Sequence, residues 1–214
     1  PWRALLTIDL QRASRISRDG LVRPTRDVQI IRSSRDATRA VGALGRFRVI
    51  SSDIETWGDS SLACVGFAGE SGKAYVFPAE YLDRVAELFG DSGLTTVWAN
   101  GIYDLFVLKH RYGVRFDCRI EDVQVAWHAA YPELAGAKED KRKHRFTRKS
   151  LAFLASLATH DPWWKGDYET RDEFFIYNGK DCCITLDTWE YVQAEVARVG
   201  AEAVYEHERG LIWP

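Results

Sequence analysis

Five side chains with carboxyl or phenol chemistry recur in three short patterns along this chain. The patterns are Asp53-x-Glu55, Asn100-x-x-x-Asp104 and Tyr177-x-x-x-Asp181. Residues two apart in an extended strand point the same way, and residues four apart on a helix share one face. The patterns therefore predict three places in the fold, on a strand or a helix, that present carboxylates. The last of them also presents a tyrosine.

A cluster of carboxylates suits metal-assisted chemistry. Mg²⁺ and Mn²⁺ prefer oxygen ligands. Two such ions about 3.5–4 Å apart can activate a water and stabilise the leaving oxygen of a phosphodiester. Without cations, neighbouring carboxylates repel one another. The sequence therefore predicts either a solvated surface or a metal site at Asp53, Glu55, Asp104 and Asp181.

Each pattern taken alone also has an ordinary structural explanation. A D-x-E at a strand end commonly marks the entry to a turn, and an N-x-x-x-D at a helix start is commonly a cap. A Y-x-x-x-D commonly pairs a core aromatic residue with a surface acid. The three patterns together, in this order and each on a suitable element, favour one shared site.

The elements that must position these residues follow from hydrophobic periodicity and from turn and cap residues. The sequence predicts strands at residues 4–10, 28–31, 47–53, 61–68, 73–77, 95–99 and 114–116. It predicts helices at residues 33–44, 79–89, 102–112, 122–130, 150–158, 171–199 and 201–210, and a polar loop at 133–147. This alternation predicts a single α/β domain with a mixed sheet.

The three patterns resemble the motifs of the DEDD superfamily of 3′–5′ exonucleases, and the tyrosine places the resemblance in the DEDDy branch. Flanking segments are similar to the proofreading domain of phage-type family A DNA polymerases, at residues 148–152, 163–165, 177–185 and 205–211. The resemblance implies an RNase H-like fold. It divides the chain into a basic arm (1–27), an exonuclease domain (28–199) and a C-terminal helix (200–214) that would lead toward a polymerase domain.

The resemblance also implies roles for individual residues. Two divalent ions, Mg²⁺ or Mn²⁺, are expected. The first ion would be held by Asp53, Glu55 and Asp181, and the second by Asp53 and Asp104. Tyr177 would orient the attacking water.

Several further residues are candidates for substrate binding. Thr56 and Asn100 are candidates for contacting the terminal nucleotide, and Trp57 is a candidate for stacking because it follows the first motif directly. Basic residues would neutralise backbone phosphates, unless they are simply a solvated face: Lys141, Arg142, Lys143 and Arg145.

Composition limits the class of protein. Aromatic residues make up 13% of the 214 residues and apolar residues 46%, enough for a packed core. The first 48 residues hold eleven arginines and four aspartates, a net charge of +7 within a chain of net charge −2. Four cysteines without CxxC spacing favour reduced thiols in a cytoplasmic compartment. The sequence shows neither a membrane span nor a signal peptide.

Three functions remain open at this point. The first is a DNA 3′–5′ exonuclease that proofreads during replication, with a frayed DNA 3′ end and a polymerase domain or subunit as partners. The second is an RNA 3′-end exonuclease of the ribonuclease D kind. The third is a nucleic-acid-binding scaffold that has lost catalysis. The intact motifs favour the first two, and the first is the principal expectation.

Overall fold

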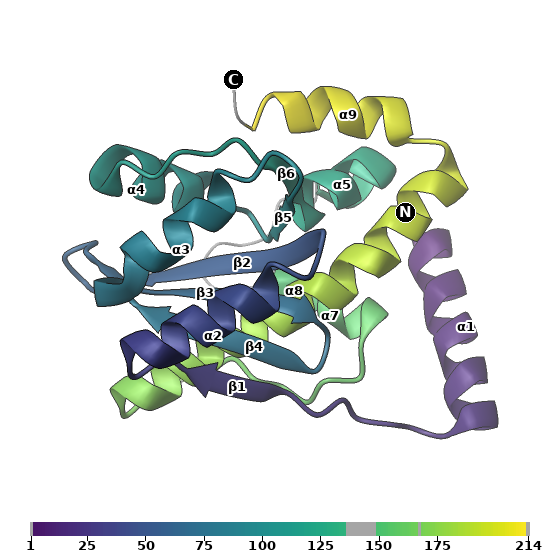
Figure 1. Cartoon of the computed structure of the whole chain (residues 1–214). Helices are drawn as coiled ribbons and strands as arrows, with labels where there is room; N and C mark the ends of the chain where they lie inside the picture. The colour runs from purple at the N-terminus through teal and green to yellow at the C-terminus, as the bar shows by residue number, and fades with distance from the viewer. Residues whose placement is uncertain (1, 136–148, 167, 213–214) are drawn as a thin grey trace.

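A computed structural model describes residues 2–135, 149–166 and 168–212. Its strands are β1 Asp27–Ile30, β2 Val49–Thr56, β3 Leu62–Glu70, β4 Lys73–Pro78, β5 Thr95–Trp98 and β6 Arg119–Asp122. They form a six-stranded sheet in the spatial order β1-β4-β3-β2-β5-β6 (Figure 1). β2, β5 and β6 are parallel, whereas β3 is antiparallel to β2 and β4. The predicted mixed α/β sheet is confirmed.

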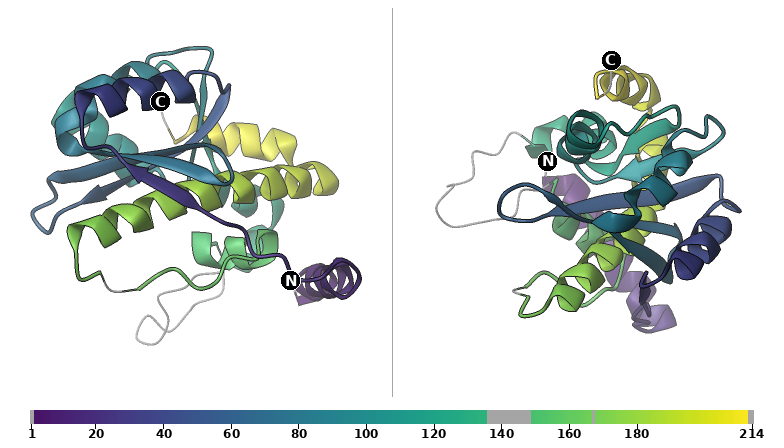
Figure 2. Two further views of the ribbon diagram at one scale, coloured as in Figure 1. Left: turned by 60° about the horizontal axis from the view of Figure 1, so that its bottom comes forward. Right: turned by 60° about the vertical axis from the view of Figure 1, so that its left-hand side comes forward.

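Helices cover both faces of this sheet. They are α1 Trp2–Asp19, α2 Ser34–Leu44, the 3₁₀ turn η1 Ala79–Tyr81, α3 Leu82–Phe89, α4 Ile102–Tyr112, α5 Val123–Ala130, α6 Pro132–Ala135, α7 Leu151–Ala158, α8 Arg171–Val199 and α9 Glu202–Gly210. α2, α3 and α4 lie on one face and α8 crosses the other (Figures 1 and 2). α5 and α7 pack on α8.

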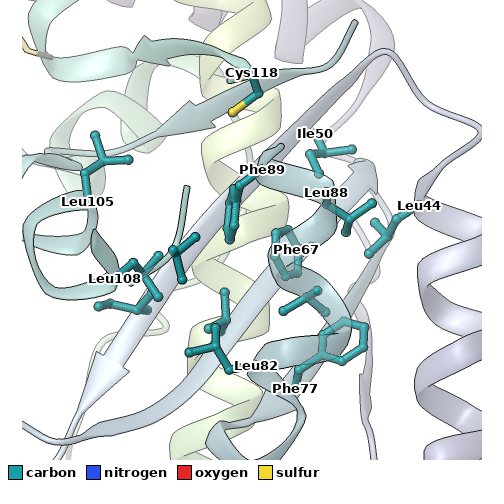
Figure 3. Packing of buried hydrophobic residues seen from close by; sticks show 14 of the residues in the cluster. Leu44, Ile50, Phe67, Phe77, Leu82, Leu88, Phe89, Leu105, Leu108 and Cys118 are labelled. Carbon is teal, nitrogen blue, oxygen red and sulfur yellow. The ribbon is translucent and has the colours of Figure 1, made fainter. Parts of the chain in front are cut away.

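The larger core lies between the sheet and the α2–α3–α4 layer (Figure 3). Phe67 from β3 contacts Phe77 and Phe89, with ring centroids 5.8 and 5.4 Å apart. A second core joins α5, α7 and α8 on the opposite side. Burial of these aromatic and aliphatic side chains holds the sheet between its two helical layers.

Local signals explain where the site-bearing helices begin and end. α8 starts with a capping box, in which Thr170 accepts from the Glu173 N–H and the Glu173 side chain accepts from the Thr170 N–H. α8 ends at Gly200 (φ 73°) and α4 ends at Gly113 (φ 69°), both in the left-handed region that favours glycine. The predicted bounds 102–112 and 171–199 are confirmed.

α8 approaches the sheet closely because glycines lie at two of the contact points, one on α8 and one on β3. A Cβ on Gly179 of α8 would lie 2.4 Å from Cγ1 of Val28 on β1. A Cβ on Gly66 of β3 would lie 2.2 Å from Oδ1 of Asn178. Neither contact is sterically possible, so the absence of side chains at both positions lets the 177–181 turn of α8 lie directly over the centre of the sheet.

Two predicted strands are wrong. Residues 4–10 belong to helix α1, where Leu5 and Ile8 pack into the second core while Leu6 and Leu10 are exposed. The alternation of apolar residues indicated a strand, but helical spacing decides which side chains are buried. Residues 114–116 form no strand, because the Val114 N–H donates to Leu108 O in α4. The strand at this edge is β6, four residues of which the sequence assigned none correctly.

Smaller differences concern residues 122–147. Asp122 closes β6 and caps α5, and Pro132 begins the short α6 instead of only ending α5. The rest of the predicted polar loop, residues 136–147, lies outside the described residues and includes all four basic candidates: Lys141, Arg142, Lys143 and Arg145.

Both ends of the described chain pack on the domain. α1 contacts α7, and its Ile8 is buried. α9 lies against α5 and β6, where the Tyr205 hydroxyl donates to the Glu121 carboxylate. The proposed division at residues 27 and 199 stays a prediction. Among the described helices, none combines the length and apolarity needed to cross a membrane.

Candidate active site

The first motif lies on β2, in the middle of the sheet. Asp53 and Glu55 are both half-buried and come from alternate positions of the strand, so they lie on the same face. Asn178 of α8 donates its Nδ2 to Oδ2 of Asp53 at 2.8 Å and to the Asp53 carbonyl at 3.2 Å. α8 therefore holds Asp53 directly, through a side chain that is completely buried.

The second motif lies where β5 turns into α4. Asp104 is buried in the first turn of α4, and its Oδ1 accepts from the Ile54 N–H of β2 at 3.0 Å. This bond joins the second motif to the first, because Ile54 stands between Asp53 and Glu55. An acid in the first helical turn also lies at the positive end of the helix dipole.

The sequence predicted that Asn100 and Asp104 share a helical face. They do not, because α4 begins only at Ile102. Asn100 precedes α4 and has a φ of 67°, in the left-handed region. Asp122, the last residue of β6, accepts from the Gly101 N–H at 2.7 Å and so holds this turn from the neighbouring strand. Asn100 nevertheless lines the same cavity as Asp53.

The third motif is presented by α8. Tyr177 and Asp181 are one turn apart, and both contact Lys165 from the segment that precedes the helix. Lys165 Nζ donates to Tyr177 Oη at 2.7 Å and to Asp181 Oδ2 at 2.9 Å. The indole N–H of Trp164 donates to the other oxygen, Oδ1, of Asp181. Protein donors thus engage both oxygens of this carboxylate.

Burial and neighbouring charges raise the pKa values of three of the four acids. Burial, followed by the charges of Asp104, Glu55 and Asp181, raises the pKa of Asp53 well above its ordinary value. Burial and the same kind of repulsion raise the pKa of Glu55 to about 8. Burial raises the pKa of Asp104 to about 7, against the hydrogen bond from Ile54. The ionised cluster therefore lacks sufficient positive charge in the protein alone.

Burial and the Asp181 charge also raise the pKa of Tyr177. The phenol is consequently neutral at physiological pH and keeps its proton. A neutral phenol can both donate and accept a hydrogen bond, which suits a group that orients water.

Asp53 and Asp181 meet on a cavity of about 250 Å³, which Lys165, Asn100, Gln124 and Ser150 also line. A larger cavity of about 710 Å³ begins at Val49 and Thr95. These residues begin β2 and β5, so the larger cavity lies at the opposite end of these strands from Asp53 and Glu55. The smaller cavity is the candidate active site.

The donor set fits Mg²⁺ or Mn²⁺ by its chemistry, because it consists of carboxylate oxygens that lack compensating charge. The side chains of the described residues are not closed around an ion, however. No three of their His, Cys, Asp or Glu groups converge closely enough to hold one. Asp53, Asp104 and Asp181 instead accept hydrogen bonds from Asn178, Ile54, and Trp164 with Lys165.

Two predicted substrate residues lie at the end of β2. Thr56 Oγ1 is 3.2 Å from the hydroxyl of Tyr103, in the turn of α4 that also carries Asp104. Trp57 is 41% exposed, and its ring centroid lies 5.5 Å from that of Phe174 in α8. Trp57, which directly follows β2, thus makes an aromatic contact with α8 and still offers an exposed ring surface.

Three residues that hold the site were not among the predicted site residues. Asn178 adjoins Tyr177, so its position beside the motif was a usable signal. Trp164 and Lys165 stand 13 and 12 residues before Tyr177, in the segment 163–165 that the resemblance included without assigning it a role. Their contacts with Asp181 show that they belong to the site.

Comparison with known proteins relates the chain to solved structures alone. No protein-family model matches the sequence, and no curated protein sequence matches it. Escherichia coli RNase D, described as an exoribonuclease involved in structured RNA processing, is similar with a TM-score of 0.60 and 15% identity, over 87% of this chain and 49% of that one. This chain thus spans about half the length of that protein.

Two further neighbours cover most of the chain. Brucella melitensis NrnC gives a TM-score of 0.63 at 15% identity over 89% of each chain, and its structure with bound Mg²⁺ gives 0.58. Trypanosoma brucei RNase D in complex with RNA U12 gives 0.54 at 17% identity, over 78% of this chain and 62% of that one. The chain therefore has the fold of RNase D-like exonuclease domains. The predicted RNase H-like fold is confirmed. The resemblance to polymerase proofreading domains stays a prediction.

Proposed function

We propose that this domain is a metal-dependent 3′–5′ exonuclease that shortens single-stranded nucleic-acid ends, with RNA as its favoured substrate. One observation carries the proposal: four carboxylates and a tyrosine from three separate elements lie at one face of the sheet, close enough that charges among them raise the pKa values of Asp53, Glu55 and Tyr177. The polarity follows from the resemblance of the motifs. RNA is favoured because two of the similar structures are ribonucleases, one of them with RNA bound.

DNA is the second candidate substrate, and the principal expectation from the sequence. It is supported by the segments that are similar to polymerase proofreading domains, at residues 148–152, 163–165, 177–185 and 205–211. If the domain belongs to a polymerase, a polymerase domain or subunit and a frayed DNA 3′ end would be its partners. In either case the substrate must reach the cavity unpaired.

The chain's own residues divide the work. Asp53, Glu55, Asp104 and Asp181 would hold two Mg²⁺ or Mn²⁺ ions, and the Mg²⁺ in the NrnC structure supports this cofactor class. When bound, the ions supply charge that lowers the pKa of water and offsets charge on the leaving oxygen. Tyr177 orients the attacking water by its hydroxyl, and Asn178 keeps Asp53 turned toward the cavity.

The free state of the cysteines supports a reducing, cytoplasmic location. Cys64, Cys118, Cys182 and Cys183 are all buried thiols, and none is in a disulfide. Thiols of this kind are typical of cytosolic proteins. We include this location in the proposal.

The test is digestion of 5′-labelled RNA and DNA oligonucleotides of one sequence, with Mg²⁺ and with EDTA. The expected product is a ladder that shortens from the 3′ end, faster for RNA and absent in EDTA. Asp181→Asn is expected to be inactive, while Asp83→Asn, an exposed acid on α3, is expected to be as active as the unchanged protein.

Specific outcomes would contradict this function. Full activity in EDTA would exclude the metals, and internal cuts or 5′ release would exclude a 3′–5′ exonuclease. A faster rate on DNA than on RNA would make DNA the favoured substrate and RNA the second candidate. A protein that binds oligonucleotides but never cleaves them would be the silent scaffold.

A further inference from the structure

The segment between α7 and α8 delivers a lysine to the third motif. Residues 159–166 carry Trp164 and Lys165, and both side chains end at the carboxylate of Asp181. The Lys165 side chain is 25% exposed, whereas the Asp181 side chain is 8% exposed. This cation lies at a cluster of four acids, and its charge opposes the raised pKa values of Asp53 and Glu55.

Lys165 makes a second contact that an ordinary ion pair does not need. Its Nζ lies 2.7 Å from Tyr177 Oη and 4.9 Å from the centroid of the same ring. An ammonium group can only donate hydrogen bonds. The Tyr177 oxygen must therefore accept from Lys165, and the phenol's own proton is directed to another group.

The segment that carries Lys165 is fastened at its start. Arg26, with a side chain 4% exposed, donates Nε and Nη2 to the two oxygens of Asp161 at 3.0 and 2.6 Å. The same Nη2 donates to Asp187 of α8 at 2.6 Å. Arg12 of α1 donates to the Thr159 carbonyl at 2.8 Å. A planar guanidinium held by two carboxylates is a rigid connection, so the segment has a defined position relative to α8.

These contacts assign a purpose to Lys165. We propose that Lys165 is a positioning residue for the exonuclease reaction: Asp181 anchors its ammonium group, which turns the hydroxyl of Tyr177 so that the phenol proton faces the reacting water. The inference rests on the proposed function and deepens it. Arg26 and Arg12 act one step further away, by fixing the segment from which Lys165 reaches Tyr177.

A double-mutant cycle tests whether Lys165 acts through Tyr177. Lys165→Met is expected to lower kcat about 10²-fold, the size of effect that misplacing a reacting group produces. KM should stay unchanged, because Lys165 is not proposed to contact the substrate. Lys165→Met combined with Tyr177→Phe should be no slower than Tyr177→Phe alone, within about twofold. Losses that multiply would overturn the inference, as would an unchanged kcat in Lys165→Met.

A second readout does not depend on activity. The nine tyrosines can be labelled with ¹³C at Cζ, and the Tyr177 signal identified by its absence in Tyr177→Phe. Lys165→Met is expected to shift this signal, because the phenol oxygen loses a charged donor. Lys73→Met is the matched control: Lys73 lies over the Tyr75 ring at 5.2 Å, so its removal should move the Tyr75 signal instead.

The two readouts separate the possible failures. If the protein without substitutions is inactive but Lys165→Met shifts the Tyr177 signal, the proposed function is removed and the contact between Lys165 and Tyr177 is kept. An active protein whose Tyr177 signal ignores Lys165→Met would remove this inference alone. Thermal unfolding establishes that each variant is folded, and Lys165→Gln replaces Lys165→Met in both experiments if the latter does not fold.

Discussion

At the residue scale, Asp53 is the acid whose ionised form the fold opposes most clearly. The Asn178 amide of α8 donates a hydrogen bond to this β2 carboxylate, and the charges of three other carboxylates repel it. A site intended only for stability would not place these acids together, because repulsion and burial both penalise their ionised forms. The cluster is tolerable where cations complete it, which is why these residues support a metal-dependent function.

The sign of the pH dependence follows from the raised pKa values. Glu55 titrates at about 8 and Asp104 at about 7 in the folded chain, against about 4 in an unfolded chain. Between these values the folded state binds more protons than the unfolded state. The free energy of unfolding of the metal-free protein should therefore fall as pH rises from about 4 to about 8.

Thermal unfolding in EDTA between pH 5 and 8.5 measures this fall. Glu55→Gln removes one of the titrating groups, so its stability should decline less steeply over the same range. Added Mg²⁺ should stabilise the unchanged protein more at pH 8 than at pH 6. A metal-free stability that rises through this window would contradict the electrostatic account of the cluster.

At the scale of elements, α8 and the segment before it assemble most of the site. α8 contributes Tyr177, Asn178 and Asp181 from a little more than one turn, and it contributes Asp187 to the Arg26 anchor. Its closeness to β3 depends on Gly66, as described above. Two predictions separate these contributions.

Gly66→Ala should destabilise the protein and disturb Asp53. The new Cβ would lie 2.2 Å from Asn178 Oδ1 and 2.7 Å from Cys182 Sγ, and overpacking of this kind costs about 1–3 kcal/mol. Chemical denaturation measures the loss. Gly42→Ala in α2 is the control, because a Cβ there has no described atom within 4 Å. It should stabilise the helix by up to about 1 kcal/mol, and equal losses in both variants would contradict the account.

Arg26→Met should cost about 3–5 kcal/mol of unfolding free energy, because it leaves Asp161 and Asp187 without their buried cation. Arg32→Met is the control. Its ion pair with Asp172 is exposed, with side-chain exposures of 64% and 52%, and pairs of this kind contribute less than about 1 kcal/mol. Hydrogen exchange should also rise in residues 159–165 of Arg26→Met. Unchanged exchange there would show that Arg26 does not hold the segment.

At the scale of the whole molecule, the charge distribution has two uses. Part of the basic N-terminal region is structural, because Arg12 donates to the Thr159 carbonyl and Arg26 to the Asp161 carboxylate. The predicted phosphate contacts belong to other residues of the chain: Lys141, Arg142, Lys143 and Arg145. If those residues contact phosphates, their charge would help to draw a polyanionic substrate toward the acidic site.

Replacing Lys141, Arg142, Lys143 and Arg145 by Gln should weaken binding of single strands and flatten its salt dependence. Each lost phosphate contact should reduce the slope of log K against log salt by about 0.7. Binding isotherms at several salt concentrations measure the slope, in EDTA to prevent cleavage. Arg39→Gln on α2, whose arginine pairs with Asp36, should leave it unchanged. An identical slope in the fourfold variant would return these residues to an ordinary solvated surface.

The sequence by itself predicted the candidate site residues and most of the framework. The motif residues are recognisable from spacing, and caps and glycines set the ends of α2, α4 and α8, because these signals act within one or two turns of the chain. The mixed α/β fold followed from the order of the elements. The same local reasoning misassigned α1, whose alternating apolar residues are sorted into core and surface only by its packing against α7.

The tertiary structure alone decided how the site is held. Asn178 reaches Asp53 across 125 positions of the sequence, and Arg26 reaches Asp161 across 135. Lys165 becomes part of the site only because the segment before α8 folds back onto that helix. Contacts of this kind depend on side chains that meet after the sheet and helices have packed, so no local pattern in the sequence encodes them.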